Sequence, residues 1–112
     1  MIEKTVLDYL KRKLNNVPVY LEIPSNRPKK YVFIQKTGSA EQDHIETAMF
    51  TVQSYDETLY KACVLNETVK DAMEDIVELD EVGAIRKNSD YPFPDADRKE
   101  YRYQSVFEIT HY

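Results

Sequence analysis

The chain has 112 residues, of which 42% are apolar or aromatic and 31% are charged, and its formal net charge is −5. Its length suits one hydrophobic core, so we expect a single domain over residues 1–112. The negative charge disfavours a surface built to hold nucleic acid, because binding to phosphates requires clustered Lys and Arg.

Membrane insertion and export are not expected from this sequence. No apolar run approaches the roughly 20 residues that a spanning helix needs. The first 15 residues alternate charged with apolar side chains, unlike the core of a signal peptide. The single cysteine, Cys63, excludes an intramolecular disulfide and is compatible with a reducing compartment.

Apolar residues at spacings of three and four predict an amphipathic helix from residue 1 to about residue 14. Asn15, Asn16 and Pro18 favour its end there. Alternating apolar residues then predict a strand over residues 17–23, and Pro18 favours an edge position for it. Pro24 and Pro28 enclose a turn that contains Arg27.

Aromatic and β-branched residues predict a central strand over residues 31–36. A polar connection over residues 38–47 leads to a third strand over residues 48–55. Apolar residues recur at helical spacing from Leu59 to Val77 and predict a second helix, for which Asp56 is the expected N-cap.

The remaining residues predict a short strand over residues 82–86, a long loop over residues 88–100 and a long strand over residues 101–112. The resulting order is α-β-β-β-α-β-β. This order predicts an α+β fold, in which two helices pack on one face of a mostly antiparallel sheet.

No arrangement of residues predicts catalysis, a cofactor or a metal. With only two glycines, Gly38 and Gly83, the chain cannot contain a P-loop or a dinucleotide fingerprint. His44, His111 and Cys63 lack the spacing of metal ligands. We therefore expect a protein that is not an enzyme and that has no cofactor and no metal site.

The stretch over residues 91–97 (YPFPDAD) is rigid and aromatic. Its acidic residues lack the glycine of a calcium loop, so turn formation explains them better. Tyr91 and Phe93 are aromatic side chains beside prolines, and we expect them to be exposed contacts.

Two stretches near the front carry a family pattern: residues 17–28 (VPVYLEIPSNRP) and residues 31–38 (YVFIQKTG). Further on, residues 52–55 (VQSY) and the stretch 91–97 leading to residues 101–104 (YRYQ) continue it. In this order the segments resemble the tail terminator proteins of long-tailed phages. Lys36 stands where that family commonly has Arg, and Ser39 where it has a second Gly.

The resemblance implies a phage or prophage protein that forms a ring, commonly a hexamer, at the head-proximal end of the tail tube. There it would stop tube polymerisation and offer a docking face to the head-tail connector protein. Its partners would be its own copies, the tail tube protein and the connector, with DNA only in transit through the lumen. It would be found in the host cytoplasm before assembly and in the virion afterwards.

The resemblance also assigns interface residues. Pro24 and Pro28 would fix a turn so that Arg27 faces a neighbouring subunit or the tube. The loop containing Tyr91, Phe93 and Pro94 would provide anchors at a subunit or tube contact.

Two other functions remain open at this point. One is another neck protein, such as a head-tail connector or stopper. The other is a small cytoplasmic regulatory or ligand-binding α+β domain. An enzyme would require His44 or His111 beside paired carboxylates in a cleft.

Overall fold

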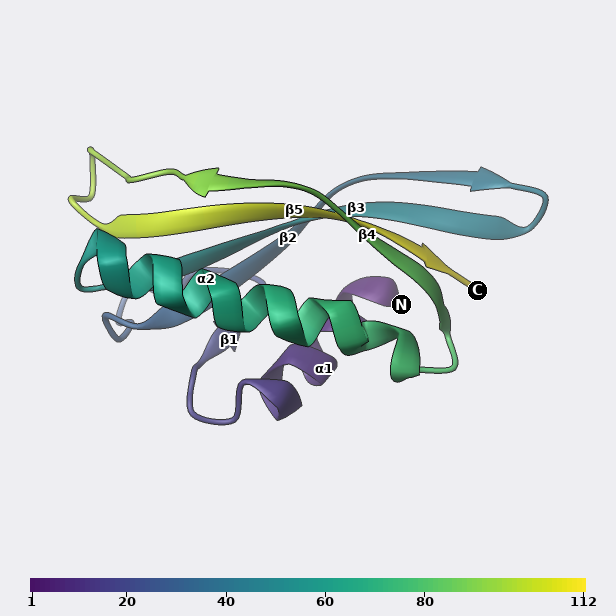
Figure 1. Ribbon diagram of the computed structural model, residues 1–112, viewed down its shortest axis with the longest axis horizontal. Helices are drawn as coiled ribbons and strands as arrows, with labels where there is room; N and C mark the ends of the chain where they lie inside the picture. The colour runs from purple at the N-terminus through teal and green to yellow at the C-terminus, as the bar shows by residue number, and fades with distance from the viewer.

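The computed structural model describes all 112 residues, whose main elements follow the order α-β-β-β-α-β-β (Figure 1). This confirms the predicted α+β class. The elements are α1 (Ile2–Lys13), β1 (Val19–Tyr20), β2 (Tyr31–Gln42), β3 (Ile45–Asp56), α2 (Leu59–Glu74), the short 3₁₀ helix η1 (Asp75–Glu78), β4 (Val82–Pro92) and β5 (Tyr101–His111).

The strands form one sheet in the order β1-β2-β3-β5-β4. β1 pairs with β2 in parallel, and every other pair is antiparallel. Both helices lie against the same face of this sheet, as Figure 1 shows. We call the opposite face, which no helix covers, the outer face.

The core fills the space between the sheet and the helices, because side chains alternate between the two faces of each strand. Phe50 and Val52 of β3 and Phe107 of β5 belong to the core that α1 and α2 cover. The alternate residues of β3, such as Gln53, point to the outer face. Tyr9 of α1 also joins the two helices, since its hydroxyl donates to the carbonyl of Ala72 at 2.5 Å.

The N-cap of the second helix lies two residues later in the chain than expected. Thr58 is the N-cap, and its hydroxyl accepts a hydrogen bond from the Lys61 N–H at 3.1 Å. The carboxylate of Asp56 accepts instead from the N–H of Glu57 at 2.7 Å. The helix tightens into η1 after Glu74, and Val77 is exposed because the three-residue turn changes the direction of its side chain.

Four strands differ in length from the prediction. Residues 38–47 continue β2 and β3 as a hairpin, whose turn residues Asp43 and His44 have φ angles of 53° and 67°. Positive φ at both central positions is the requirement of the tight hairpin turn that matches strand twist. β4 extends to Pro92, whereas β1 is only two residues long and Leu21 after it is 41% exposed.

No helix of the structure is both long and apolar enough to cross a membrane.

Polar side chains connect α2 to the edge strand β4. The carboxylate of Asp90 accepts from the side-chain amide of Asn66 at 3.1 Å, and it pairs with Lys70 at 2.9 Å and Lys87 at 3.0 Å. The hydrogen bond from Lys70, followed by that from Lys87, lowers the pKa of Asp90. The pKa of Lys70 is raised by its bonds to Glu67 and Asp90.

This cluster predicts an acid-sensitive contribution to stability. Because the folded state lowers the pKa of Asp90, its contribution is present above the unfolded value of about 4 and is lost as the pH falls through the folded value. We expect Asp90→Asn to lower the free energy of unfolding at neutral pH by about 1–2 kcal/mol and to flatten its decline below pH 4. Urea titrations across this pH range measure both effects.

The matched control is Asp71→Asn, on the exposed side of α2. It should leave the parent pH profile in place. An Asp90→Asn variant with the same acid decline as the parent would contradict the assignment.

Candidate functional site

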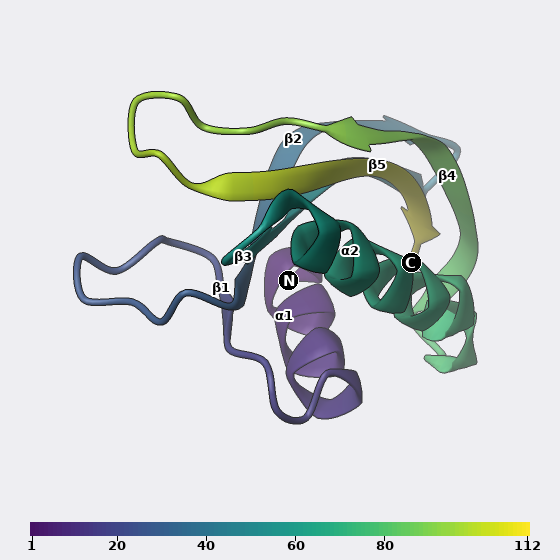
Figure 2. The ribbon, with the colours of Figure 1, turned by 60° about the vertical axis from the view of Figure 1, so that its left-hand side comes forward.

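The two proline-punctuated stretches lie side by side at one end of the molecule (Figure 2). One is the connection between β1 and β2, and the other is the connection between β4 and β5. We call these two connections, residues 21–30 and 93–100, the loop end. In Figure 2 both project beyond the helices on the left-hand side.

An ion pair joins the two loops. The guanidinium of Arg27 donates to the Glu100 carboxylate, and both side chains are 22% exposed. The same guanidinium donates to the carbonyl of Pro24 at 3.2 Å. The pKa of Arg27 is raised, mainly by the hydrogen bond with Glu100. The contact therefore fixes the shape of one loop and its distance from the other.

The second oxygen of Glu100 accepts a hydrogen bond from the hydroxyl of Tyr31 at 2.7 Å. Burial first, and then this bond to a carboxylate, raise the pKa of Tyr31. Its ring stacks on that of Tyr55, with a centroid distance of 4.3 Å and an angle of 9° between planes. These tyrosines seal the outer face of the sheet at the loop end.

Arg102, at the start of β5, holds the second loop. Its guanidinium lies over the ring of Phe93 at 4.2 Å, and its Nε donates to the Phe93 carbonyl at 2.6 Å. It also donates to the Tyr55 hydroxyl at 3.0 Å and pairs with Asp95 at 3.5 Å. One cation therefore fixes the aromatic tip of the loop against the sheet.

A line of hydrogen bonds continues across the outer face. The Tyr55 hydroxyl donates to Gln53 at 2.8 Å, and the Gln53 amide donates to Gln104 at 2.8 Å. The Gln104 amide donates in turn to the Tyr91 hydroxyl at 2.6 Å. Because Gln53 and Gln104 are buried, this line satisfies amide groups that would otherwise destabilise the sheet.

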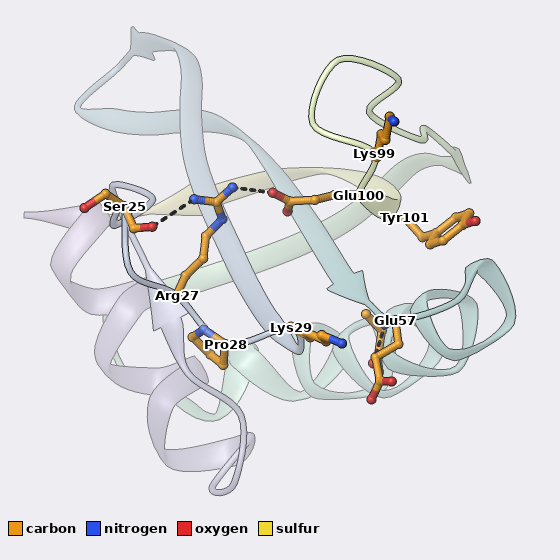
Figure 3. Close-up of a pocket in the computed structure, with 9 residues that line it drawn as sticks. Ser25, Arg27, Pro28, Lys29, Glu57, Lys99, Glu100 and Tyr101 are labelled. Atoms are coloured by element: carbon orange, nitrogen blue, oxygen red, sulfur yellow. Dashed lines mark hydrogen bonds and ion pairs between the residues drawn. The ribbon is translucent and has the colours of Figure 1, made fainter.

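An open cleft of about 490 Å³ lies at the loop end (Figure 3). Its lining comes from both loops and from the residues just before α2. It comprises Ser25, Arg27, Pro28, Lys29, Asp56, Glu57, Lys99, Glu100 and Tyr101. Figure 3 shows Arg27 and Glu100 pointing toward each other. The lining is mostly polar and of mixed charge, unlike the largely apolar pockets that bind small molecules.

The histidines lie away from this cleft. His44 is in the hairpin turn, and His111 lies beside Glu46, with 3.7 Å between ring nitrogen and carboxylate. No group of three or more His, Cys, Asp or Glu side chains is placed to hold a metal ion.

The structure brings the six predicted interface residues to this one end of the molecule. Pro24 and Pro28 bound the turn, but Arg27 between them is bonded within the chain and points to Glu100. Tyr91 and Phe93 are 38% and 40% exposed, and their rings meet edge to face at 6.1 Å. Pro94 is exposed beside them.

Two residues that hold the loops in place, Glu100 and Arg102, were not predicted from the sequence. Glu100 lies just before the predicted strand over residues 101–112, and Arg102 lies within it. The local sequence pattern does not indicate which distant residues these two side chains bind. The available signal was the alternation of Arg102 and Gln104 with Tyr103, which places two polar side chains on one strand face.

No protein-family model matches this sequence, and no curated protein matches it either.

The ion pair between the loops predicts a measurable coupling. In a double-mutant cycle, Arg27→Ala and Glu100→Ala should be clearly non-additive in the free energy of unfolding, because each removes the partner of a half-buried charge. The reference cycle is Arg86→Ala with Glu108→Ala, a pair on the outer face in which Arg86 is 71% exposed. Its coupling should be smaller, since solvent screens such pairs. Equal couplings in urea denaturation would contradict the structural role of Arg27.

Proposed function

We propose that this chain is a phage or prophage tail terminator. In this role it forms a ring, most simply a hexamer, that caps the head-proximal end of the tail tube. The ring stops polymerisation of the tube and presents a docking face to the head-tail connector protein.

One observation carries the proposal: the segments that resemble the family converge in a single network. Arg27 belongs to the first segment and Tyr31 to the second, and both bind Glu100. Tyr55 of the third segment stacks on Tyr31 and accepts from Arg102 of the last. Similar segments that were scattered over the surface would support no common role, whereas here they build one surface.

The loop end has the properties of a protein contact rather than of a reaction centre. Tyr91 lies at the end of β4 rather than in the expected loop, and it is exposed, as are Phe93 and Pro94 in the loop that follows. The contacts of Arg102 and Gln104 hold these three residues in one arrangement. A rigid aromatic anchor loses little conformational entropy when a partner binds. We assign Tyr91, Phe93, Pro94 and the exposed Pro28 to the contact itself, with Arg27 and Pro24 supporting the loop shape.

Two further properties suit a ring around a DNA passage. Both outer strands of the sheet have unpaired edges, which can join identical copies into a closed, head-to-tail assembly. The net charge of −5 disfavours retention of DNA, so a molecule in transit would not adhere.

Phe93→Ala tests the role of the loop end. We expect binding to the tail tube protein, or ring formation, to weaken at least about tenfold, because a central aromatic anchor is lost. The matched control is Tyr112→Ala, which removes an aromatic ring that is 73% exposed just after β5, at the opposite end of that strand from the loop. Negative-stain images and mass measurements, with and without the tube protein, give the readout. Equal behaviour of the two variants would count against the assignment.

Tail length in infected or induced cells separates the proposal from the other neck proteins. Loss of a terminator should give overlong tubes. Loss of a connector or stopper should give tubes of normal length and heads that leak DNA. A protein that stays monomeric and ignores tube protein would favour a regulatory or ligand-binding domain.

A further inference from the structure

The sheet leaves unpaired backbone at both of its edges, on β2 beyond the short β1 and on β4. β1 pairs only with Val32 and Phe33 of β2, so β2 has no partner on that side from Gln35 to Gln42. At the opposite edge, β4 has no partner beyond its contact with β5. Exposed strand edges of this kind are templates for pairing with another chain.

Hydrogen bonds identify the backbone groups on the free edge of β2. The N–H of Val32 donates to the carbonyl of Pro18, so the backbone N–H and C=O of Val32 point away from β3. The backbone groups of every second residue, Ile34 and Lys36, point the same way. An extra residue then interrupts the pairing with β3 between Lys36 and Gly38. Beyond it, Ser39 and Glu41 face the free edge.

The same reasoning applies to β4. The N–H of Phe93 donates to the carbonyl of Arg102, so Arg102 and every second residue of β5 face β4. The β4 residues opposite the intervening positions of β5 therefore face the free edge. They are Pro92, Asp90, Lys87, Ile85 and Val82, with one extra residue between Lys87 and Ser89 and another between Val82 and Ala84.

We call the residues whose backbone N–H and C=O point to a free edge the outward groups. The outward groups of β2 and of β4 have matching spacings along their strands. On β2 they are separated by three residues and then two, at Lys36, Ser39 and Glu41. On β4, counted in the opposite direction, Asp90, Lys87 and Ile85 show the same separations. When the edges are aligned antiparallel, the irregularity of β2 between Lys36 and Gly38 therefore coincides with the irregularity of β4 between Lys87 and Ser89.

We propose that β4 of one copy pairs antiparallel with the free edge of β2 of the next copy, with Asp90 opposite Lys36, Lys87 opposite Ser39 and Ile85 opposite Glu41. This inference rests on the proposed function, because it names the contact that joins the copies of the ring. β2 and β4 run in opposite directions in the sheet, so each added copy continues the sheet in one orientation, as a head-to-tail contact requires.

The ends of the pairing and its charges agree with this register. Pro92, which has no N–H to donate, falls opposite Ile34, where the cover of β2 by β1 ends. The register also opposes the cation Lys36 to the anion Asp90. Opposite charges at directly paired positions stabilise a sheet.

A designed disulfide tests this register. Ala40 and Arg86 would face each other without hydrogen bonds, with α-carbons about 4.5 Å apart, which is within the range of a disulfide. In a Cys63→Ser background, we expect Ala40→Cys with Arg86→Cys to give a ladder of covalent oligomers on mild oxidation. The control is Gln42→Cys with Arg86→Cys, two residues out of register, which should give little product.

A second variant tests the edge itself. Ser39→Pro removes an N–H that faces the free edge and no bond to β3, whereas Ser39→Ala keeps the N–H. We expect Ser39→Pro to weaken association at least tenfold in mass measurements, alone and with tube protein, and Ser39→Ala to behave as the parent.

The outcomes separate the two proposals. The edge pairing would be overturned if the Ala40→Cys, Arg86→Cys variant formed rings but gave no disulfide on oxidation, or if the Ser39→Pro variant still formed rings. Either result would leave the tail terminator function standing. In-register disulfides without closed rings or tube binding would support the edge pairing and overturn the function. The absence of both rings and disulfides would overturn both.

Discussion

The structure depends on a sheet that helices cover on one face only. At the loop end, the helix-free outer face still buries two aromatic rings, Tyr31 and Tyr55, each about 1% exposed. Their hydroxyls must find partners there, because a buried polar group without a hydrogen bond is costly. Glu100 and Arg102 supply those partners, so the loops act as the missing cover of the sheet.

This arrangement makes the loops part of the folded core rather than appendages. Glu100 accepts from both Arg27 and Tyr31, and the guanidinium of Arg102 lies over the ring of Phe93. The exposed aromatic loop is consequently held by the same bonds that seal the sheet. A loop that is already held in one conformation loses little conformational entropy when a partner protein binds. This is the physical reason to assign the aromatic loop to protein binding.

The sequence predicted the elements that periodicity controls, and it failed where geometry between distant residues decides. Both helices and the order of strands were predicted correctly. The hairpin at Asp43 and His44 was missed because neither residue is the glycine that usually marks such a turn. The turn at Arg27 was recognised, but its direction depends on Glu100, which lies 73 residues away along the chain.

The spacing of the outward backbone groups does not by itself choose between the two edges. Counted from Ile34 on β2 and from Pro92 on β4, these groups are separated by two, three and two residues, an order that reads the same in both directions. Two β2 edges, or two β4 edges, would therefore also match in spacing. The direction of assembly makes the difference. A pairing of like edges closes a twofold dimer and adds no further copy at that edge, whereas a pairing of β4 with β2 repeats from copy to copy and either closes into a ring or extends without limit.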